Sequence, residues 1–470
     1  MPNIKKTKII ATIGPSSENK NIMLELLDAG VNIFRFNMKH NTSSWHEEKI
    51  NQARHISKEK GVPLGILIDL QGPEIRIKTV NDKVLKLSEN EEFLCTYNEK
   101  YLAEGGKIII IPEPLVIKNI DVNDNFTIDD GKNHFIVTKK GEDFVIVKSL
   151  GDYEIGTNKS LNLIQKDLPL ASLTDSDIKK LNIAAKIKPE FIALSFVRSQ
   201  EDIKELRKEM GKRHLNSEII SKIESQKGVD NIDEIINESD GIMIARGDLG
   251  IETPIERVPY FQKETIQKCR HKLKSVIVAT QMLESMMYSS IPSRSEAADI
   301  SNAVFDSTDC TMLSGETAQG KYPVLSASVM SKIVKYNEDL VEHKDIDIEC
   351  LDITKRVAHA VLSVSKLGKI DKIVALTASG YTADIISALR PMVPIIAVTD
   401  KEDTFGKLTI NYGTVPVLSK IPVGDIFSYD KVINQLKKES LISAGDKIVV
   451  THGQKFGVPG KTNSLVFLEI

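Results

Sequence analysis

Charged residues follow two apolar runs in the stretch from residue 218 to residue 250. The residues just after these runs are Lys222, Glu224, Arg246, Gly247 and Asp248. A lysine beside two carboxylates is typical of a site for a hard divalent cation and an anionic substrate. Taken alone, Lys222 and Glu224 fit a surface ion pair equally well. Only the elements that position these side chains can separate the two interpretations.

Both apolar runs are predicted to be buried strands joined by a helix. Hydrophobic residues recur between them at helical spacing, at Val229, Ile232, Ile235 and Ile236. Charges that cluster at the carboxyl ends of parallel strands are typical of the active site of an α/β barrel. The metal-site interpretation therefore requires further strand–helix units elsewhere in the chain.

Such units occur on both sides of the stretch. The other predicted strands are Lys8–Ile13, Val31–Phe36, Leu64–Ile68, Phe191–Phe196, Val276–Ala279 and Thr311–Leu313. With the two strands above they give about eight strand–helix units, the number that closes a (β/α)8 barrel. Polar residues that follow the second and third of these strands are Arg35, Asn37, Lys39, His40 and Asp69.

The pattern changes between Ile75 and Gly156, where the helical period is lost. Short alternating stretches such as Asn125–Ile128 are separated by turn signals such as Asp130-Gly131. This pattern predicts a small all-β insertion between two barrel units. An insertion at the active-site end of a barrel can act as a lid.

A further domain is predicted after the charged stretch near residues 341–349. The strand Ile373–Leu376 leads into the hydroxyl-rich turn Thr377–Thr382 and then into a helix. Such a turn can bind an anion, but capping of the helix explains the same hydroxyls and is commoner. The later loop around Gly460-Lys461-Thr462 lacks the first glycine of a P-loop and a following helix, so we reject a Walker nucleotide site.

Composition agrees with a cytoplasmic globular protein of roughly three domains. Hydrophobic residues form 41% and charged residues 27% of the 470 residues, and the net charge is −3. That charge gives no electrostatic case for nucleic acid or an anionic membrane as a partner. No segment resembles a signal peptide or a membrane helix. Without a CxxC pair, a zinc site or disulfide frame is not expected of Cys95, Cys269, Cys310 and Cys350.

Eight motifs in chain order resemble those of the pyruvate kinase family. They are TKIIATIGPSS, NIFRFN, DLQGPEIR, LSFVR, IISKIES, MIARGDLG, ATQMLESM and MLSGETAQGKYP. The resemblance implies an α/β fold in which a (β/α)8 TIM barrel carries an inserted small β-barrel lid domain and a C-terminal α/β domain. We expect the barrel at residues 1–70 and 168–342, the lid at 71–167 and the C-terminal, regulatory domain at 343–470.

The resemblance also implies transfer of the phosphoryl group of phosphoenolpyruvate to ADP, giving pyruvate and ATP. Glu224 and Asp248 match the carboxylate ligands of Mg²⁺, for which Mn²⁺ can substitute. Lys222 matches the cation that stabilises the migrating phosphoryl group and the enolate, and Arg35 flanks that group. The positions that match the substrate-carboxylate pocket are Gly247, Asp248 and Thr280, and those near the nucleotide are Arg76, His40, Asn37 and Lys159.

Ketonisation of enolpyruvate requires a proton, and no histidine sits at the strand ends around the substrate. Thr280 and Ser314 are placed where hydroxyls could relay a proton through water, with Glu316 nearby. A simple helix cap at Ser314 fits the sequence equally well.

Members of the family commonly bind K⁺ beside the phosphoryl group. Asn37 and Asp69 match two of its ligands, and Leu70 can offer its carbonyl. The family's serine ligand is replaced by Lys39, which has only donors and cannot ligate a cation. Its ammonium could take the place of K⁺, held by Asp69 and Glu74.

In the K⁺-independent subfamily a lysine usually stands at the position of Glu74. Leu70, Gln71 and Ile77 fit that subgroup, whereas Glu74 does not. Our hypothesis is that Lys39 replaces K⁺ and that K⁺ is not required. The alternative is that Lys39 points to solvent and K⁺ binds in a depleted site.

The turn that contains Thr377, Ser379, Gly380 and Thr382 resembles the family's effector loop. Fructose bisphosphate, another sugar phosphate and AMP all remain open as effectors, and the resemblance implies a homotetramer. Two rival functions are a lyase or mutase that uses the same Mg²⁺ pair and a catalytically silent binding protein of this family. Arg76 and His40, which match nucleotide contacts, and the predicted insertion count against the lyase or mutase. The presence of Lys222, Glu224, Asp248 and Thr280 counts against the silent binding protein.

Overall fold

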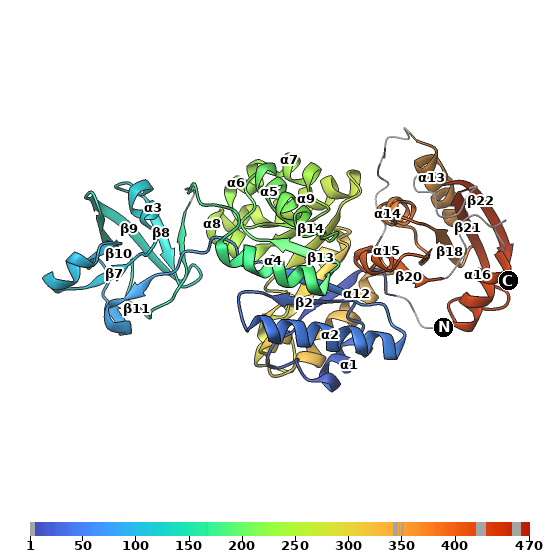
Figure 1. The fold of residues 1–470 in the computed structure, drawn as a ribbon, viewed down its shortest axis with the longest axis horizontal. Coiled ribbons are helices and arrows are strands. Elements are labelled where there is room, and N and C mark those ends of the chain that lie inside the picture. Colours follow the sequence, from blue (N-terminus) through green and yellow to red (C-terminus); the bar gives the residue numbers. More distant parts are fainter. Residues whose placement is uncertain are drawn as a thin grey trace.

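The computed structural model describes residues 5–164, 166, 168–341, 346, 348, 352–419, 429–453 and 462–470. Cys350, Gly460 and Lys461 lie outside these residues. Figure 1 shows three bodies in a row, with the inserted domain on the left, the barrel in the centre and the C-terminal domain on the right. None of the helices among the described residues has the length and apolar composition that a membrane crossing needs.

Eight parallel strands close the central barrel, as predicted. In chain order they are β1 (Lys8–Thr12), β2 (Ile33–Asn37), β3 (Gly65–Asp69), β13 (Phe191–Leu194), β14 (Glu218–Ile223), β15 (Gly241–Ala245), β16 (Ser275–Ala279) and β17 (Cys310–Leu313). Each strand pairs with its neighbours in sequence order, and β17 closes onto β1. The carboxyl ends of all eight strands therefore meet at one mouth.

Helices surround the barrel and bury one face against the strands. They are α1 (Lys20–Asp28), α2 (Ser43–Lys60), α4 (Asp175–Ile187), α5 (Gln200–Gly211), α6 (Gln226–Asp230), α7 (Ile232–Glu238), α8 (Arg246–Glu252), α9 (Val258–His271), α10 (Arg294–Phe305), α11 (Gly315–Ala318) and α12 (Pro323–Glu338). Helix α2 shows the local signals clearly: Thr42 accepts the N–H of Trp45, and Gly61 ends the helix with φ +65°. In α7 the buried residues are Ile232, Ile235 and Ile236, at the predicted spacing.

The inserted domain leaves the barrel after β3 and returns before α4, so it stands at the mouth. Its strands are β4 (Lys78–Thr79), β5 (Leu85–Leu87), β6 (Glu92–Thr96), β7 (Ile108–Ile110), β8 (Asn125–Ile128), β9 (Asn133–Lys140), β10 (Phe144–Ser149), β11 (Tyr153–Ile155) and β12 (Leu161–Leu163). Seven form one curled sheet from β12 to β4, and β5 pairs with β11. An isolated β-bridge between Arg76 and Ser160 joins the two chain segments next to β4 and β12, the end strands of this sheet.

The insertion is not wholly β, which corrects the sequence expectation. It also contains helix α3 (Pro114–Asn119), in which Glu113 accepts the N–H of Leu115 and proline occupies the first turn. Val116 and Ile117 of this helix are fully buried in the core of the insertion. Six residues are too few to establish a 3.6-residue period, which explains why the pattern was missed.

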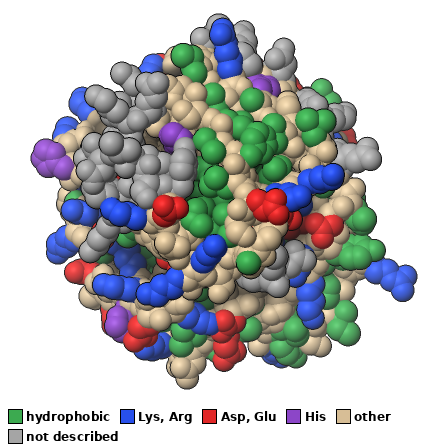
Figure 2. Space-filling model, turned by 90° about the vertical axis from the view of Figure 1, so that its right-hand side faces the viewer, with side chains coloured by type: hydrophobic (Ala, Val, Ile, Leu, Met, Phe, Trp, Pro, Cys, Tyr) green, Lys and Arg blue, Asp and Glu red, His purple; other side chains and the backbone are tan. Residues whose placement is uncertain are grey.

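The C-terminal domain contains a five-stranded mixed sheet. Its strands are β18 (Lys372–Leu376), β19 (Ile395–Thr399), β20 (Thr414–Leu418), β21 (Lys447–Gly453) and β22 (Thr462–Glu469), and its helices are α13 (Ile353–Lys366), α14 (Tyr381–Ala388), α15 (Glu402–Lys407) and α16 (Tyr429–Lys438). Strand β22 is antiparallel and lies at the edge of the sheet. Figure 2 shows this end of the molecule, with hydrophobic side chains gathered near its centre.

A short segment of the C-terminal domain closes the end of the barrel opposite the mouth, which we call the lower end. Ile410 belongs to the same buried cluster as the side chains that fill the barrel interior. Lys8 Nζ donates to the Thr414 carbonyl at 2.6 Å, and Cys310 Sγ lies 3.4 Å from the Ile410 carbonyl. A Cβ on Gly65 would stand 2.4 Å from Thr409 Oγ1, so this glycine admits the segment. The two domains are therefore packed directly against each other at this end, with Ile410 inserted into the core of the barrel.

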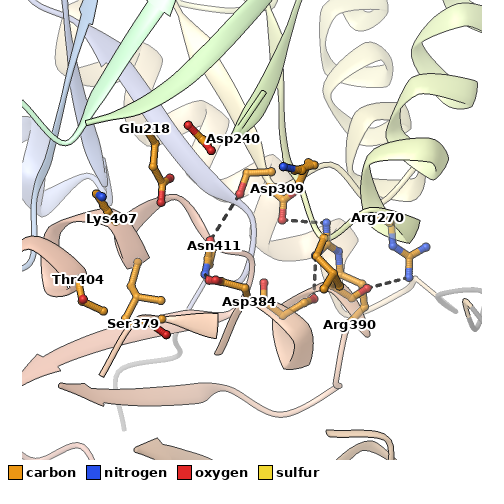
Figure 3. Close-up of a pocket in the computed structure, with 17 residues that line it drawn as sticks. Glu218, Asp240, Arg270, Asp309, Ser379, Asp384, Arg390, Thr404, Lys407 and Asn411 are labelled. Atoms are coloured by element: carbon orange, nitrogen blue, oxygen red, sulfur yellow. Dashed lines mark hydrogen bonds and ion pairs between the residues drawn. The ribbon is translucent and has the colours of Figure 1, made fainter. Parts of the chain in front are cut away.

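A small polar cavity lies at this contact between the domains (Figure 3). Glu218 enters it from the amino end of β14, while Asp384 and Lys407 enter it from the C-terminal domain. Asn411 Nδ2 donates to Asp384 Oδ1 at 2.7 Å. Burial, and then the charge of Asp384, raise the pKa of Glu218 to about 8, and burial raises the pKa of Asp384 to about 6. Lys407 opposes both shifts without cancelling them.

The raised pKa of Glu218 makes stability depend on pH in a defined direction. Its contribution is complete below the ordinary glutamate pKa of 4.5 and is lost as the pH rises towards about 8, because only the folded chain still holds the proton. Glu218→Gln should therefore melt close to the wild type near pH 5 and several degrees above it at pH 8, on the order expected for a few kcal/mol. Exposed Glu89→Gln is the matched control. A difference in melting temperature that does not change with pH would contradict the assignment.

Candidate active site

Asp69 lies at the centre of a charged cluster in the barrel mouth. Arg35 reaches Asp69 Oδ2 through Nε at 2.8 Å and Nη2 at 2.7 Å, and Lys222 Nζ lies 3.4 Å from Oδ1. These residues end β2, β3 and β14, which are not all neighbours in sequence but meet at the mouth. Burial alone would raise the pKa of Asp69, but Lys222 and Arg35 hold it below its ordinary value. The carboxylate is therefore ionised and holds two cations together.

The ammonium group of Lys222 contacts three oxygen atoms. Besides Asp69, Nζ lies 2.8 Å from Ser195 Oγ and 2.9 Å from Glu224 Oε1. Burial disfavours its charge, but Asp69 and Glu224 outweigh burial and raise the pKa of Lys222 well above its ordinary value. Lys222 and Glu224 are therefore a buried pair, which excludes the surface ion pair that the sequence left open.

Glu224 and Asp248 form a pair of carboxylates with surplus negative charge. Glu224 is almost fully buried, and its Oε2 accepts the N–H of Phe196 at 2.7 Å. Burial, and then the charge of Glu224, raise the pKa of Asp248 to about 7. Three carboxylates including Asp69 face two cations, so one carboxylate lacks a cationic partner, in agreement with the raised pKa of Asp248.

This charge and donor set fit a divalent cation. Within the described residues no group of three or more acidic, histidine or cysteine side chains is arranged to hold a metal. Two carboxylates leave further coordination positions for water and substrate oxygens, as Mg²⁺ prefers. Asp248 also lines clefts of about 500 Å³ and about 1110 Å³ between the insertion and the barrel. A substrate can therefore reach the carboxylate pair.

The loop after β16 is held in a strained shape. Thr280 has φ +67° and Gln281 φ +54°, a region that costs a β-branched residue about 1–3 kcal/mol. Arg246 donates to the Thr280 carbonyl at 2.8 Å and pairs with Asp299 at 2.6 Å, so it fixes this loop. Thr280 Oγ1 accepts the N–H of Gly247 at 2.8 Å and donates to the Ala279 carbonyl at 2.7 Å.

Ser314 and Glu316 follow β17 on the same side of the mouth. The Ser314 side chain makes no cap for helix α11, which excludes the simple capping interpretation. Among the described residues its buried Oγ has no hydrogen-bond partner. Glu316 instead accepts the backbone N–H of Ser314 at 2.8 Å and of Leu283 at 3.0 Å. Ser314 therefore keeps a hydroxyl that is free for other partners.

Lys39, Glu74 and Arg76 form a second charged group. Lys39 Nζ lies 2.7 Å from Glu74 Oε2, and Arg76 Nη2 lies 2.8 Å from Glu74 Oε1. Lys39 therefore pairs with Glu74 and not with Asp69, whose oxygens are engaged by Arg35 and Lys222. Burial, and then Lys39, Arg76 and Arg35, lower the pKa of the adjacent His40. This part of the mouth is electropositive, as a site for phosphates requires.

The remaining predicted residues are less close to the central cluster. Asn37 Oδ1 accepts the N–H of Lys39 at 3.1 Å, and the Leu70 carbonyl accepts from Ser195 Oγ at 2.7 Å. Lys159 pairs with Asp129 of the insertion at 2.9 Å, and its carbonyl accepts the N–H of Ile77 at 2.9 Å. Lys159 therefore sits on the chain that joins the insertion to the barrel.

The hydroxyl-rich turn before α14 lies at the opposite, lower end of the barrel. Thr377 Oγ1 accepts the N–H of Gly380 at 2.9 Å, and Thr382 Oγ1 shares a hydrogen bond with Thr462 Oγ1 at 2.6 Å. Ser379 is exposed and lines the cavity between the domains. The hydroxyls of Thr377 and Thr382 are therefore already engaged within the fold.

Sequence reasoning missed three residues that hold the central cluster. Thr12 Oγ1 accepts from Arg35 Nη1 at 2.9 Å, Phe196 supplies its N–H to Glu224, and Ser195 contacts Lys222. Ser195 and Phe196 directly follow β13, and Thr12 is the last residue of β1. Their place at strand ends is the only signal the sequence contains, because none of them carries a charge.

Comparisons with known proteins agree with this geometry. The family model described as "Pyruvate kinase, barrel domain" matches residues 4–327, and "Pyruvate kinase, alpha/beta domain" matches residues 355–467. A pyruvate kinase of Thermotoga maritima is 35% identical over 473 residues, which cover 99% of this chain and 100% of that protein. One from Dictyostelium discoideum is 35% identical over 481 residues, with 99% and 94% covered. One from Sporosarcina psychrophila is 35% identical over 473 residues, with 98% and 80% covered.

The raised pKa of Asp248 predicts how a divalent cation should bind. Because Asp248 must lose its proton to ligate a cation, affinity for Mn²⁺ should fall below pH 7, by up to about tenfold per pH unit. Asp248→Asn should abolish tight binding. Electron paramagnetic resonance of free Mn²⁺ measures both effects without an activity assay. Asp230→Asn, which removes another carboxylate at the mouth, is the control, and constant wild-type affinity between pH 6 and 8 would refute the assignment.

Proposed function

This chain belongs to the pyruvate kinase family, and we propose that the cluster around Asp69 is where it transfers the phosphoryl group of phosphoenolpyruvate to ADP. The observation that carries this assignment is the contact of Asp69 with Arg35 and Lys222 beside the Glu224–Asp248 pair. Two cations next to two carboxylates suit a phosphoryl group that is handed over together with a metal ion. Full-length similarity to pyruvate kinases counts against the lyase or mutase, and the intact cluster counts against the catalytically silent protein.

The residues have separable roles in this proposal. Lys222 and Arg35 hold the negative oxygens of the phosphoryl group, and Lys222 stabilises the enolate as it forms. Glu224 and Asp248 would hold Mg²⁺, which supplies neutralising charge to the phosphoryl and enolate oxygens. Gly247 and Thr280 would receive the substrate carboxylate, which competes for the Gly247 N–H because charged acceptors form the stronger hydrogen bonds.

We propose that the inserted domain closes over this mouth as a lid. The cleft of about 500 Å³ between them is lined by both bodies, including Glu74, Ser160 and Asp248. Arg198 donates to the carbonyls of Leu168 and Leu170, which tie the returning chain to the barrel. Closure would bring Arg76, His40, Asn37 and Lys159 around the nucleotide and exclude water from the transfer.

We propose that Lys39 takes the place of K⁺. The positions of Lys39 and Glu74 are in direct contact, so a lysine at either position puts its ammonium into the same space. The expected K⁺ ligands already have partners, since Asn37 Oδ1 and the Leu70 carbonyl each accept a hydrogen bond and Asp69 holds two cations. A lysine at position 39 rather than at position 74 would account for the departure of Glu74 from the K⁺-independent subgroup.

We propose that Ser314, rather than Thr280, passes the proton to enolpyruvate. The Thr280 hydroxyl donates its proton to the Ala279 carbonyl, whereas Ser314 Oγ has no partner among the described residues. A hydroxyl without a protein partner keeps its proton and its lone pairs for a relay, and Glu316 fixes its backbone. The hydroxyl acts here as a relay, because its own acidity is too low for it to be a source.

Two proposals concern regulation and assembly. An effector phosphate, from a sugar phosphate or AMP, would bind the turn around Ser379 and Gly380, and titration of each compound against phosphoenolpyruvate saturation distinguishes them. The chain would form a homotetramer, since edge strand β22 exposes Phe467, neighbouring α13 exposes Ile353, and Leu367 at the end of α13 is also exposed. Unpaired apolar edges favour association, and sedimentation velocity measures its extent.

The first prediction from the proposed function concerns K⁺ dependence. In a coupled assay with phosphoenolpyruvate, ADP and Mg²⁺, wild-type turnover in tetramethylammonium should stay within about twofold of that in K⁺, because Lys39 supplies the charge. Lys39→Ser should lose roughly tenfold, or about 1.4 kcal/mol, and regain it when K⁺ is added. Surface Lys20→Ser should behave as the wild type does. Strong K⁺ activation of the wild type would end the hypothesis.

The second prediction separates the two hydroxyls. Ser314→Ala should slow exchange of the methyl protons of pyruvate with D₂O by roughly 10²-fold, the usual size of a lost proton-transfer group. Nuclear magnetic resonance of pyruvate follows that exchange without phosphoryl transfer. Thr280→Val removes the other hydroxyl and, at saturating pyruvate, should slow exchange much less than Ser314→Ala does. If Ser314→Ala exchanges at the wild-type rate, the relay must lie elsewhere.

A further inference from the structure

Ser195 lies among the phosphoryl-binding groups although it carries no charge. It is the first residue after β13 and only 3% exposed. Its Oγ lies 2.8 Å from Lys222 Nζ, 2.7 Å from the Leu70 carbonyl oxygen and 3.5 Å from Asp69 Oδ1. The hydroxyl thus touches both the phosphoryl-binding lysine and the segment where the family's K⁺ would bind.

The chemistry of the partners fixes the direction of both short hydrogen bonds. A carbonyl oxygen only accepts, so the hydroxyl must donate its single proton to Leu70. An ammonium only donates, so the lone pairs of the same oxygen must accept from Lys222. The Leu70 carbonyl therefore orients the hydroxyl, and the hydroxyl in turn orients the ammonium.

This orientation divides the three protons of the Lys222 ammonium. Ser195 and Glu224 accept at 2.8 Å and 2.9 Å, whereas Asp69 lies at 3.4 Å and is already held twice by Arg35. The third proton thus has the most distant acceptor. A phosphoryl oxygen can accept a hydrogen bond from that proton with the least loss of existing contacts, provided the other two protons keep their partners.

The backbone around Ser195 is shaped to keep its hydroxyl in place. Phe196 adopts φ +54°, which directs its N–H to Glu224 Oε2. A Cβ on Gly72, itself at φ +69°, would stand 2.9 Å from Ser195 Cβ. The Leu70 N–H donates to the Ala193 carbonyl at 3.0 Å, which ties the accepting segment to β13. Several constraints therefore converge on one uncharged side chain.

We propose that Ser195 is a positioning residue that aims the ammonium of Lys222 at the transferring phosphoryl group. The proposal rests on the proposed function, in which Lys222 contacts that group. Removing the hydroxyl leaves every charge of the site in place but frees one ammonium proton, so Lys222 turns towards Glu224 and Asp69. The loss then falls on the chemical step and not on substrate binding.

Variants of two buried serines test this role. Ser195→Ala and Ser195→Cys both remove a good acceptor, and cysteine nearly keeps the side-chain volume if alanine impairs folding. Each should lower kcat by roughly tenfold, or about 1.4 kcal/mol, with the KM for phosphoenolpyruvate and the affinity for Mn²⁺ within about threefold of wild type. Ser221→Ala is the control, because Ser221 is fully buried on the strand of Lys222 but pairs with Ser239 at 2.6 Å.

The outcomes distinguish this inference from the proposed function on which it rests. Wild-type kcat in either Ser195 variant overturns the positioning role, as does a loss that only parallels a fall in melting temperature like that of Ser221→Ala. Lys222→Met provides the second comparison. If Lys222→Met keeps wild-type kcat, the proposed function of the cluster fails. If it is inactive while Ser195→Ala is fully active, only the inference about Ser195 fails.

Discussion

The arrangement of this barrel mouth depends on one buried carboxylate that holds two cations side by side. Arg35 and Lys222 would repel each other in a site with little water, and each would lose hydration without return. Asp69 between them compensates both charges, and its two oxygens receive them separately. The pair is thus ready before any substrate binds. Electrostatic groups that are already in position do not have to reorganise during the reaction, which is where much catalytic stabilisation originates.

The same strand links this mouth to the lower end of the barrel. Strand β14 begins at Glu218, in the cavity shared with the C-terminal domain, and ends beside Lys222 and Glu224. The lower end is closed by Ile410 of the other domain. A change in how the C-terminal domain sits would therefore act directly on the first residue of the strand that carries Lys222. Packed cores transmit such displacements because they tolerate few voids.

The sequence predicted the fold well because strand ends follow a strict rule. Eight apolar runs, each followed by polar residues, suffice to predict a closed barrel with one mouth, and this prediction is confirmed. The contacts between side chains within the mouth were harder to predict, since they depend on side-chain lengths and on strands far apart in the chain. Lys39 was expected to pair with both Asp69 and Glu74, but Arg35 and Lys222 occupy Asp69, so only the pairing with Glu74 forms. Uncharged Ser195 gave no signal, because a buried serine at a strand end usually has only a structural role.

Charge is separated across the mouth in a way that net charge conceals. The β14–β15 side has an uncompensated carboxylate at Asp248, whereas the β2 side gathers Lys39, Arg35 and Arg76 around a single Glu74 and the central Asp69. A divalent cation suits the first side and the phosphates of a nucleotide suit the second. In the proposed function the phosphoryl group crosses between them, over Lys222. Because Lys222 bonds to both Asp69 and Glu224, its ammonium lies between the acidic side and the basic side of the mouth. A small change in the direction of its N–H groups has its largest effect there. An uncharged hydroxyl can control that direction without disturbing the balance of charge, which a carboxylate in its place could not do.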